Sequence, residues 1–346
     1  MRADAQTRAT NQGAAGRPAR GARHALLGGL FALAGVVGAV PSASGQEASW
    51  PARPITIIVN VAAGSSIDVI ARALSVPLRE ALGQPVVIDN RSGAAGNIGA
   101  EIAARAAPDG YTILASPASV MTINPFLYPA MKFEAFKDLV PVAVLATVTS
   151  LLVARPGLPV GSYPEFVAHA RSRAGKLSYA SPGVGSVPHL EAEIFNGAIG
   201  ASAAHVPYRG GLLALQDVIS GQVDYVFDSG TAVPHIRSGK VKLIAVATPK
   251  RSPLFPDTAT LDELGVKGFD GSTTHGLYLP AGTPPAVMAR LNTEINRAVV
   301  LPAIREQFAA LGAEPTPISP AQFRTVLETE AARYGAVVKE RKITVE

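Results

Sequence analysis

The sequence predicts an α/β fold in which short strands alternate with helices and form mostly parallel sheets. From Pro54 onward, strand-length runs of β-branched and other apolar residues alternate with stretches of helical spacing, which is typical of α/β folds. Several expected strands end in loops of small and hydroxyl-bearing residues, as strands do where ligands bind at the carboxyl edge of an open sheet. About 300 residues of this kind suffice for about two domains.

The expected strands are runs rich in valine, isoleucine and leucine at residues 55–59, 86–88, 111–114, 142–145, 223–227 and 243–246. Apolar residues after the first run recur at helical spacing and predict a helix that Gly83 closes; they are Ile67, Ile70, Leu74, Leu78 and Leu82. Pro77 lies inside this helix and is expected to kink it, because proline lacks the N–H that bonds back one turn. Later helices are expected at 190–199, 212–220 and 286–300.

Residues 1–45 have the pattern of a secretory signal peptide. Five arginines precede an apolar run, Ala25–Val40, and small residues from Pro41 to Gly45 follow it. The run has 16 residues, four of them glycine, whereas a membrane-spanning helix needs about 20 mostly apolar residues. We therefore expect export, with cleavage near Ser44 or Gly45, rather than a permanent membrane anchor.

Removing the leader changes the charge of the chain. Residues 1–45 hold five of the 31 basic residues and one of the 26 acidic residues, which leaves 26 basic and 25 acidic side chains in the mature chain. A net charge near zero argues against a nucleic-acid partner. The chain has no cysteine, so neither disulfides nor thiolate metal sites can form, and an exported fold must be stabilised by burial alone. We expect no cofactor and no metal.

The loops that follow the strands are the candidate binding elements. They lie at residues 63–66, 116–119, 178–186 and 228–231. Small residues at the start of a helix leave backbone N–H groups exposed, and these donors, together with the helix dipole, favour an anion. The sequence therefore predicts a site for a carboxylate, with these ligand-binding candidates: Gly64, Ser65, Ser66, Asp68, Ser116, Ser119, Ser181, Gly183, Ser186, Asp228 and Ser229.

Helix capping is the alternative role for several of these residues. The segment Ser65-Ser66-Ile67-Asp68 fits a capping box, in which Asp68 would fold back onto the amide of the N-cap residue. Ser181 and Ser186 can serve the same purpose. Capping and ligand binding can coexist, because an N-cap side chain leaves other amides free.

Two enzyme classes were weighed against the binding hypothesis. Residues 93–99 follow a strand and open a helix, but Ala95 stands where a dinucleotide-binding turn requires glycine. A hydrolase would use Ser186 as nucleophile with His189 and Asp228 as its partners. No G-x-S-x-G elbow surrounds Ser186, so we expect no catalytic residues and keep His189 as a ligand-binding candidate.

Motifs along the whole mature chain resemble those of the Bug family, the substrate-binding receptors of tripartite tricarboxylate transporters. They lie at residues 50–55, 63–68, 82–87, 90–99, 107–112, 123–125, 205–210, 221–224, 280–284 and 311–315. No single motif is decisive, but all stand in the family's order.

The resemblance implies a two-lobed periplasmic binding protein of type II, whose chain crosses twice between lobes and binds its ligand in the cleft between them. Residues 50–149 with 276–346 would form one lobe, and residues 150–275 the other. The family's ligands are small carboxylates, held by backbone amides, hydroxyls and water. Lobe closure would be recognised by the transporter's membrane subunits, with the receptor acting as a monomer; a ligand-sensing receptor without a transport role is the alternative.

Departures from the family's usual pattern bear on specificity. Ser65 replaces a common glycine, and Met121 stands where histidine is common. Ser229 replaces part of an Asp-Asn pair, and Thr274-His275 replaces an aromatic pair that often lines the cleft. His275 therefore joins the ligand-binding candidates and favours a polar, dicarboxylic ligand.

The sequence also predicts how the carboxylate is held. Amides of Gly64, Ser65 and Ser66 in one lobe, and of Ser181, Gly183 and Ser186 in the other, would converge on one ligand. Substitution of Gly64 or Gly183 by valine is then expected to weaken binding more than Arg91→Ala.

Overall fold

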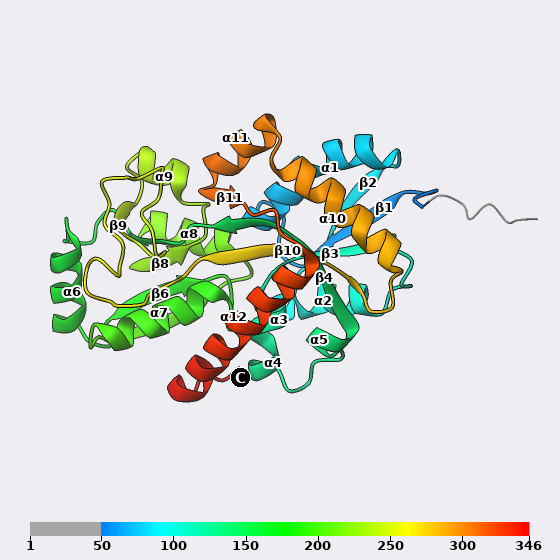
Figure 1. The fold of residues 1–346 in the computed structure, drawn as a ribbon. Helices are drawn as coiled ribbons and strands as arrows, with labels where there is room; N and C mark the ends of the chain where they lie inside the picture. The colour runs from blue at the N-terminus through cyan, green and yellow to red at the C-terminus, as the bar shows by residue number, and fades with distance from the viewer. Residues whose placement is uncertain (1–49, 346) are drawn as a thin grey trace, which may run out of the picture. The chain divides into compact units, whose positions relative to one another are not determined.

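The computed structural model describes residues 50–345, which form two β-sheets with helices packed against them (Figure 1). The expected signal peptide, residues 1–45, lies outside the described residues. One sheet has six strands in the order β11-β4-β10-β3-β1-β2, and the other has five in the order β7-β6-β8-β5-β9. The first sheet contains β1 (Ile55–Val59), β2 (Val86–Asn90), β3 (Thr112–Pro117), β4 (Leu139–Val148), β10 (Thr273–Pro280) and β11 (Ala313–Pro315). The second contains β5 (Leu151–Ala154), β6 (Leu177–Ser181), β7 (Ala203–Pro207), β8 (Tyr225–Asp228) and β9 (Lys242–Val246).

Both faces of the first sheet are buried. Since successive side chains of a strand point to opposite faces, Ile57 and Ile58 of β1 enter different apolar clusters. The cluster around Ile57 includes residues of α1 (Ser66–Leu82), α10 (Pro285–Val299) and α11 (Pro302–Ala310). The cluster around Ile58 includes residues of α2 (Asn97–Ala104), α3 (Ser119–Thr122), α5 (Ala135–Asp138) and α12 (Pro320–Arg341). The short helix α4 (Asn124–Leu127) follows α3.

The second sheet is also covered on both faces. Aromatic residues fill the side next to α6 (Tyr163–Ser172) and α7 (Val187–Ala198), where Phe166 and Phe195 pack with Tyr225. Aliphatic residues fill the other side, which α8 (Gly211–Ser220) and α9 (Val233–Arg237) cover. The two sheets thus have separate cores.

The chain passes between the sheets twice. Thr149 and Ser150 join β4 to β5, and residues 247–272 join β9 to β10. The Ala247 N–H donates to the Ser150 carbonyl oxygen at 2.8 Å, and the Gly271 N–H donates to the Ala247 carbonyl oxygen at 2.7 Å. We call Ser150, Ala247 and Gly271 the crossover junction. The predicted α/β fold with two crossovers is confirmed, whereas the residue bounds of the lobes stay a prediction.

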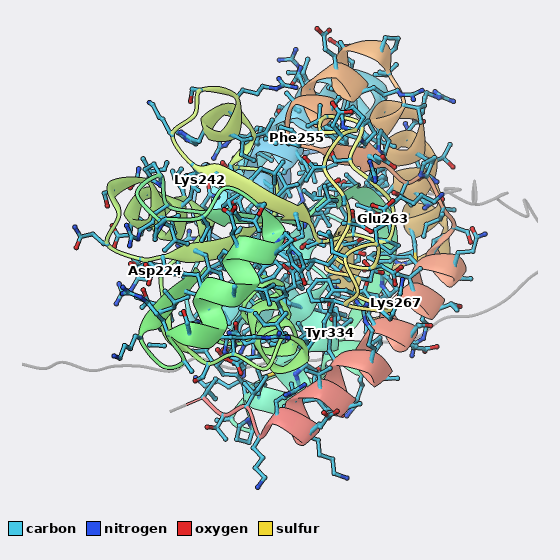
Figure 2. The ribbon with its side chains drawn as sticks, turned by 90° about the vertical axis from the view of Figure 1, so that its left-hand side faces the viewer. Asp224, Lys242, Phe255, Glu263, Lys267 and Tyr334 are labelled. Carbon is cyan, nitrogen blue, oxygen red and sulfur yellow. The ribbon has the colours of Figure 1, made fainter. Side chains whose placement is uncertain are left out.

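Helix α12 spans the junction from outside. It contacts α3 and α4 beside the first sheet and α7 beside the second. Its buried Tyr334 and Val338 join one apolar cluster with Ile123 and Leu127 on one side and Leu190 on the other. Tyr334 is labelled in Figure 2, where α12 lies beside α7.

The expectation of mostly parallel sheets is wrong for the strands next to the crossovers. β1 is parallel to β2 and β3, and β6 is parallel to β7 and β8. β10 is antiparallel to β3 and β4, and β5 is antiparallel to β8 and β9. The reason is the chain path: β4 leaves the first sheet and β10 returns to it, so the two strands run in opposite directions. The six expected strands are present, and α1 continues through Pro77.

Gly99 allows the close packing of α2 on the end of β1. A β-carbon there would lie 2.7 Å from the Arg91 carbonyl oxygen and 2.8 Å from the Asn60 β-carbon. We expect Gly99→Ala to lower the free energy of unfolding by about 1–3 kcal/mol, because the backbone must shift to admit the methyl group. Urea denaturation followed by circular dichroism measures this. Gly161→Ala is the control, since its β-carbon would approach only Glu165 Oε2, at 3.4 Å; equal losses in both variants would contradict the packing argument.

Candidate ligand-binding site

A cavity of about 550 Å³ is lined by residues that follow strands of both sheets. From the first sheet come the β1–α1 loop, the turn before α2 and the ends of β3 and β10; from the second come the loops after β6, β7 and β8. The loops of the two sheets touch at one side of the cavity, where a β-carbon on Gly210 would lie 3.3 Å from the Ala62 β-carbon. The cavity therefore lies between the two sheets, at loops that the sequence indicated.

Asp68 fixes the β1–α1 loop. Its side chain is buried and accepts hydrogen bonds from the Gly64 N–H at 2.9 Å, Asn90 Nδ2 at 2.9 Å and Arg72 Nε at 3.0 Å. Burial raises the pKa of Asp68, but the hydrogen bonds from Arg72, Gly64 and Asn90 outweigh it and hold the pKa below its usual value. The carboxylate is thus a structural anion behind the cavity wall.

The expected capping box at the start of α1 does not form. The Ser65 side chain accepts no hydrogen bond from the helix and donates to the Ala62 carbonyl oxygen at 2.8 Å. Asp68 receives the N–H of Gly64, one residue before the N-cap. Gly64 has a φ of +81°, so the chain turns sharply just before the N-cap. Ser65 and Ser66 line the cavity, whereas Gly64 and the buried Asp68 are not among its lining residues.

Ser66 pairs with His275 at the cavity. Ser66 Oγ lies 2.8 Å from His275 Nε2, and both residues line the cavity. Burial lowers the pKa of His275 to about 3, so the imidazole is neutral near pH 7. Its Nδ1 has no hydrogen-bond partner among the described residues. His275 thus presents a neutral ring, not a cation, to this part of the site.

The loop after β6 is held by two stacked histidines. The rings of His189 and His205 lie 4.0 Å apart, centroid to centroid, with an interplanar angle of 8°. His189 Nδ1 accepts the Gly185 N–H at 3.2 Å, and His205 Nε2 lies 2.6 Å from Ser181 Oγ. Burial lowers their pKa values to about 3 for His189 and about 4 for His205. Both rings are neutral near pH 7 and act as supports for the loop.

The amides predicted to bind a ligand in this loop are already paired. The Gly183 N–H donates to Ser181 Oγ at 3.2 Å, and the Ser186 N–H donates to the Gly183 carbonyl oxygen at 3.2 Å. Ser186 also caps α7, accepting the His189 N–H at 3.4 Å. Capping was one of the two roles weighed for Ser186, and the structure shows it. Gly183 and Ser186 still line the cavity, whereas Ser181 and His189 lie behind it.

The start of α8 was missed by the sequence reasoning. Tyr208, Arg209, Gly210 and Gly211 line the cavity, and Gly210 is the N-cap with a φ of +127°. A Gly-Gly pair before a helix was the available signal, but β7 was not recognised as a strand. Arg209 is the one arginine or lysine among the lining residues.

The remaining candidates are divided between the wall and the interior. Ser119, Asp228 and Ser229 line the cavity. Asp228 accepts the Ala232 N–H at 2.6 Å and a bond from the Thr231 hydroxyl, and burial raises its pKa. Ser229 Oγ lies 3.0 Å from Thr273 Oγ1. Ser116 is fully buried behind the wall and receives a hydrogen bond from Asn60 Nδ2 at 2.9 Å.

The hydrolase arrangement does not form. The Ser186 hydroxyl donates to the Gly183 carbonyl oxygen at 2.7 Å, and His189 Nδ1 is occupied by the Gly185 N–H. Asp228 pairs with Thr231 and Ala232. A nucleophile needs a base within hydrogen-bond reach and a third group that orients the base; the recorded bonds of these three residues serve loop structure instead.

Residues 70–343 match the family model of the tripartite tricarboxylate transporter family receptor. The chain belongs to this family. BugT of Bordetella pertussis is 37% identical over 318 residues, which are 91% of this chain and 96% of BugT. The family resemblance predicted from the motifs is confirmed.

Solved structures of Bug-type proteins have the receptor's fold. The periplasmic binding protein BugD matches with a TM-score of 0.81 and 33% identity, covering 86% of this chain and 100% of BugD. An R. palustris protein solved with adipate gives 0.82 and 33%, covering 85% and 99%. MatC from Rhodopseudomonas palustris with bound malate gives 0.79 and 34%, covering 84% and 100%.

Family membership decides the class of protein. The tripartite tricarboxylate transporter receptors are periplasmic solute-binding proteins and not enzymes, so the hydrolase and dinucleotide alternatives fall away. In residues 50–345 of the receptor, no helix combines the length and apolar character needed to span a bilayer.

Asp68 is expected to stabilise the receptor through the loop it holds. Asp68→Ala leaves the Gly64 N–H without its acceptor and removes one of the two acceptors of Asn90 Nδ2, so we expect the free energy of unfolding at pH 7 to fall by about 1–3 kcal/mol. Because the pKa is lowered in the folded state, this contribution is present above the unfolded value near 3.8 and is lost as the pH falls through the folded value. Urea denaturation at pH 7 and pH 3 tests both points; a difference between wild type and variant that does not shrink at pH 3 would refute the electrostatic part.

Proposed function

We propose that the receptor binds a small carboxylate in the periplasm and presents it to the membrane subunits of a tripartite tricarboxylate transporter. Family membership supports the transporter class, and the structures with malate and adipate support the ligand class. The cavity of about 550 Å³ falls within the size range of small-molecule sites, about 300–1,000 Å³.

The observation that carries the proposal is that helices from both sheets begin at the cavity. Ser66 and Ile67 are the first residues of α1, and Gly211 is the first residue of α8; all three line the cavity. The first amides of a helix have no partner within the helix, and the helix dipole adds positive potential at the same place. Helices that pack against different sheets thus offer N–H donors to one anion.

The charges on the wall agree with a carboxylate ligand. Arg209 is the one arginine or lysine in the lining. The Asp228 carboxylate already accepts hydrogen bonds from the Thr231 hydroxyl and the Ala232 N–H. Much of the remaining wall is small or apolar, including Ala94, Pro182 and Val187. Such a wall suits the short hydrocarbon part of a di- or monocarboxylic acid, while the helix starts receive its charged ends.

We extend the proposal to the lobes and their movement. Residues 50–149 with 276–346 would move as one lobe and residues 150–275 as the other, closing on the ligand with the crossover junction as the hinge. Contacts between the β1–α1 and β7–α8 loops, such as Ala62 with Gly210, support closure at this point. A ligand held by both helix starts would favour the closed form, because it binds that form more tightly.

A carboxylate is expected to raise the melting temperature of the mature receptor, because a ligand that binds only the folded state stabilises it. Thermal-shift measurements with malate, adipate and other mono-, di- and tricarboxylates test this, and the matching primary alcohols or amides serve as controls. Stabilisation by the neutral analogues, with none by any carboxylate, would refute the ligand class.

The substitutions suggested by the sequence cannot isolate the backbone donors. Gly64 and Gly183 have φ values of +81° and +144°, where valine is strained, and both amides are already paired. Gly211 suits the test better, because its φ is not positive and a β-carbon there would meet only Pro182 Cγ, at 3.7 Å.

We expect Gly211→Val to weaken binding of the carboxylate found in the screen by roughly tenfold to a hundredfold. The valine side chain would block the ligand's approach to the first amides of α8, and a lost charge-assisted hydrogen bond costs about 1.5–3 kcal/mol. Arg209→Ala is expected to weaken it less, because Arg209 is exposed. Arg91→Ala is the control, since Arg91 pairs with Asp89 at 2.9 Å and does not line the cavity. Titration calorimetry decides; full affinity in Gly211→Val with loss of binding in Arg209→Ala would favour an arginine clamp over helix-start amides.

A further inference from the structure

Glu191 is a buried carboxyl group that contacts both crossover segments. It lies on α7 with 1% of its surface exposed, and its Oε2 accepts a hydrogen bond from the Ser150 hydroxyl at 2.6 Å. A β-carbon on Gly271 would overlap Glu191 Oε1, so this oxygen rests against the Gly271 backbone. The carboxyl group therefore fills the space between the two places where the chain passes from sheet to sheet.

Glu330 of α12 contacts the start of β10, directly after the second crossover. Its Oε1 accepts a hydrogen bond from the Thr274 hydroxyl at 2.8 Å. One turn further, Arg333 Nη1 donates to the Asp270 carbonyl oxygen at 3.0 Å and lies 3.7 Å from its Oδ2. A carboxyl group of α7 thus contacts the crossover junction itself, and a carboxyl group and an arginine of α12 contact the chain where the second crossover enters β10.

Burial, more than the neighbouring charges, favours the protonated form of both carboxyl groups. Burial raises the pKa of Glu191 well above its usual value, and the nearby carboxylates of Asp270 and Asp228 add to this, against the Ser150 hydrogen bond and the Arg333 charge. Burial raises the pKa of Glu330 to about 7, against the Thr274 hydrogen bond and the same arginine.

The remaining titratable groups that face this region are tyrosines. Tyr278 of β10 faces Glu330, and Tyr334 of α12 faces both glutamates. The hydroxyls of both tyrosines are buried without a hydrogen-bond partner among the described residues, and burial raises their pKa values. Neither tyrosine supplies a positive charge, so Arg333 is the counter-charge that the structure places beside the two glutamates.

We propose that Glu191 and Glu330 form a proton-dependent latch on the crossover segments, and that their protonated forms favour the closed cavity. An ionised carboxylate at Glu191 would be buried against Gly271 beside two other acids, so it requires water, and water can enter only if the segments separate. A raised folded-state pKa means that protons stabilise the packed junction fully below the ordinary value near 4.5, and that this stabilisation is lost as the pH rises through the raised values.

The consequence for ligand binding rests on the function proposed above. Proton binding and ligand binding would both favour closure, so they are coupled and each strengthens the other. The receptor would then hold its carboxylate more tightly in mildly acidic than in alkaline surroundings. The test therefore needs one readout of closure that requires no ligand, and one readout of affinity.

The readout without ligand uses spin labels on either side of the cavity. The chain has no native cysteine, so Glu80→Cys on α1 and Gln216→Cys on α8, both exposed positions, can carry one label each. Electron-spin distance measurements at pH 5.5 and pH 8.5 are expected to show a shift of population toward longer separation at the higher pH. In the Glu191→Gln/Glu330→Gln double variant, which keeps uncharged side chains of the same shape, we expect the short separation at both pH values.

The affinity readout is titration of malate and adipate at the same two pH values. We expect the affinity of the wild type to fall by at least about fivefold from pH 5.5 to pH 8.5, each single Gln variant to lose part of this change, and the double variant to lose all of it. Glu328→Gln, an exposed residue of α12 paired with Arg324, is the control and should behave as wild type. If neither malate nor adipate binds, the proposed ligand class fails, and the spin-label distances still test the latch. The latch proposal would be overturned if the double variant kept the pH response of the wild type, or if the wild type showed no pH response.

Discussion

The structure depends on the hydrogen-bonded row where the chain crosses between its two sheets. Ser150, Ala247 and Gly271 come from three distant parts of the chain and are joined by bonds of 2.8 and 2.7 Å. The first crossover is only two residues long, so β4 and β5 cannot move far apart, and the loops that follow the other strands must face each other across one cavity.

The loops at the cavity are held by hydrogen bonds within each loop, which leaves only some of their amides for a ligand. The side chains of Asp68, Ser181 and His189 accept hydrogen bonds from the backbone N–H groups of Gly64, Gly183 and Gly185, respectively. Such internal pairing fixes the wall before a ligand arrives and lowers the entropic cost of binding. The donors that remain include those in the first turns of α1 and α8, where the geometry of a helix leaves N–H groups without partners.

Burial has opposite effects on the buried histidines at the cavity and on the buried glutamates near the crossover junction. Burial lowers the pKa values of His189, His205 and His275 to between about 3 and about 4, so the cavity and its supports stay uncharged at these positions near neutral pH. Burial raises the pKa values of Glu191 and Glu330 at the junction. The same cause acts in opposite directions, because the neutral form of histidine is the base and that of glutamate is the acid.

The sequence by itself determined the α/β fold and the family, and it predicted eight of the residues that line the cavity: Ser65, Ser66, Ser119, Gly183, Ser186, Asp228, Ser229 and His275. That the loops bind an anion stays a prediction. The fold and most of these residues follow from local patterns, because strand length, helix spacing and small residues after a strand can be read within a few neighbours. The family and His275 came instead from the resemblance of motifs along the whole chain. Only the tertiary structure decided which groups are free. In the structure the Gly183 and Ser186 amides form hydrogen bonds within their own loop. Arg209 and Gly211 line the cavity, and Glu191 packs against Ser150 and Gly271. Pairing across long stretches of chain leaves no local pattern, since it depends on where the crossovers bring each segment.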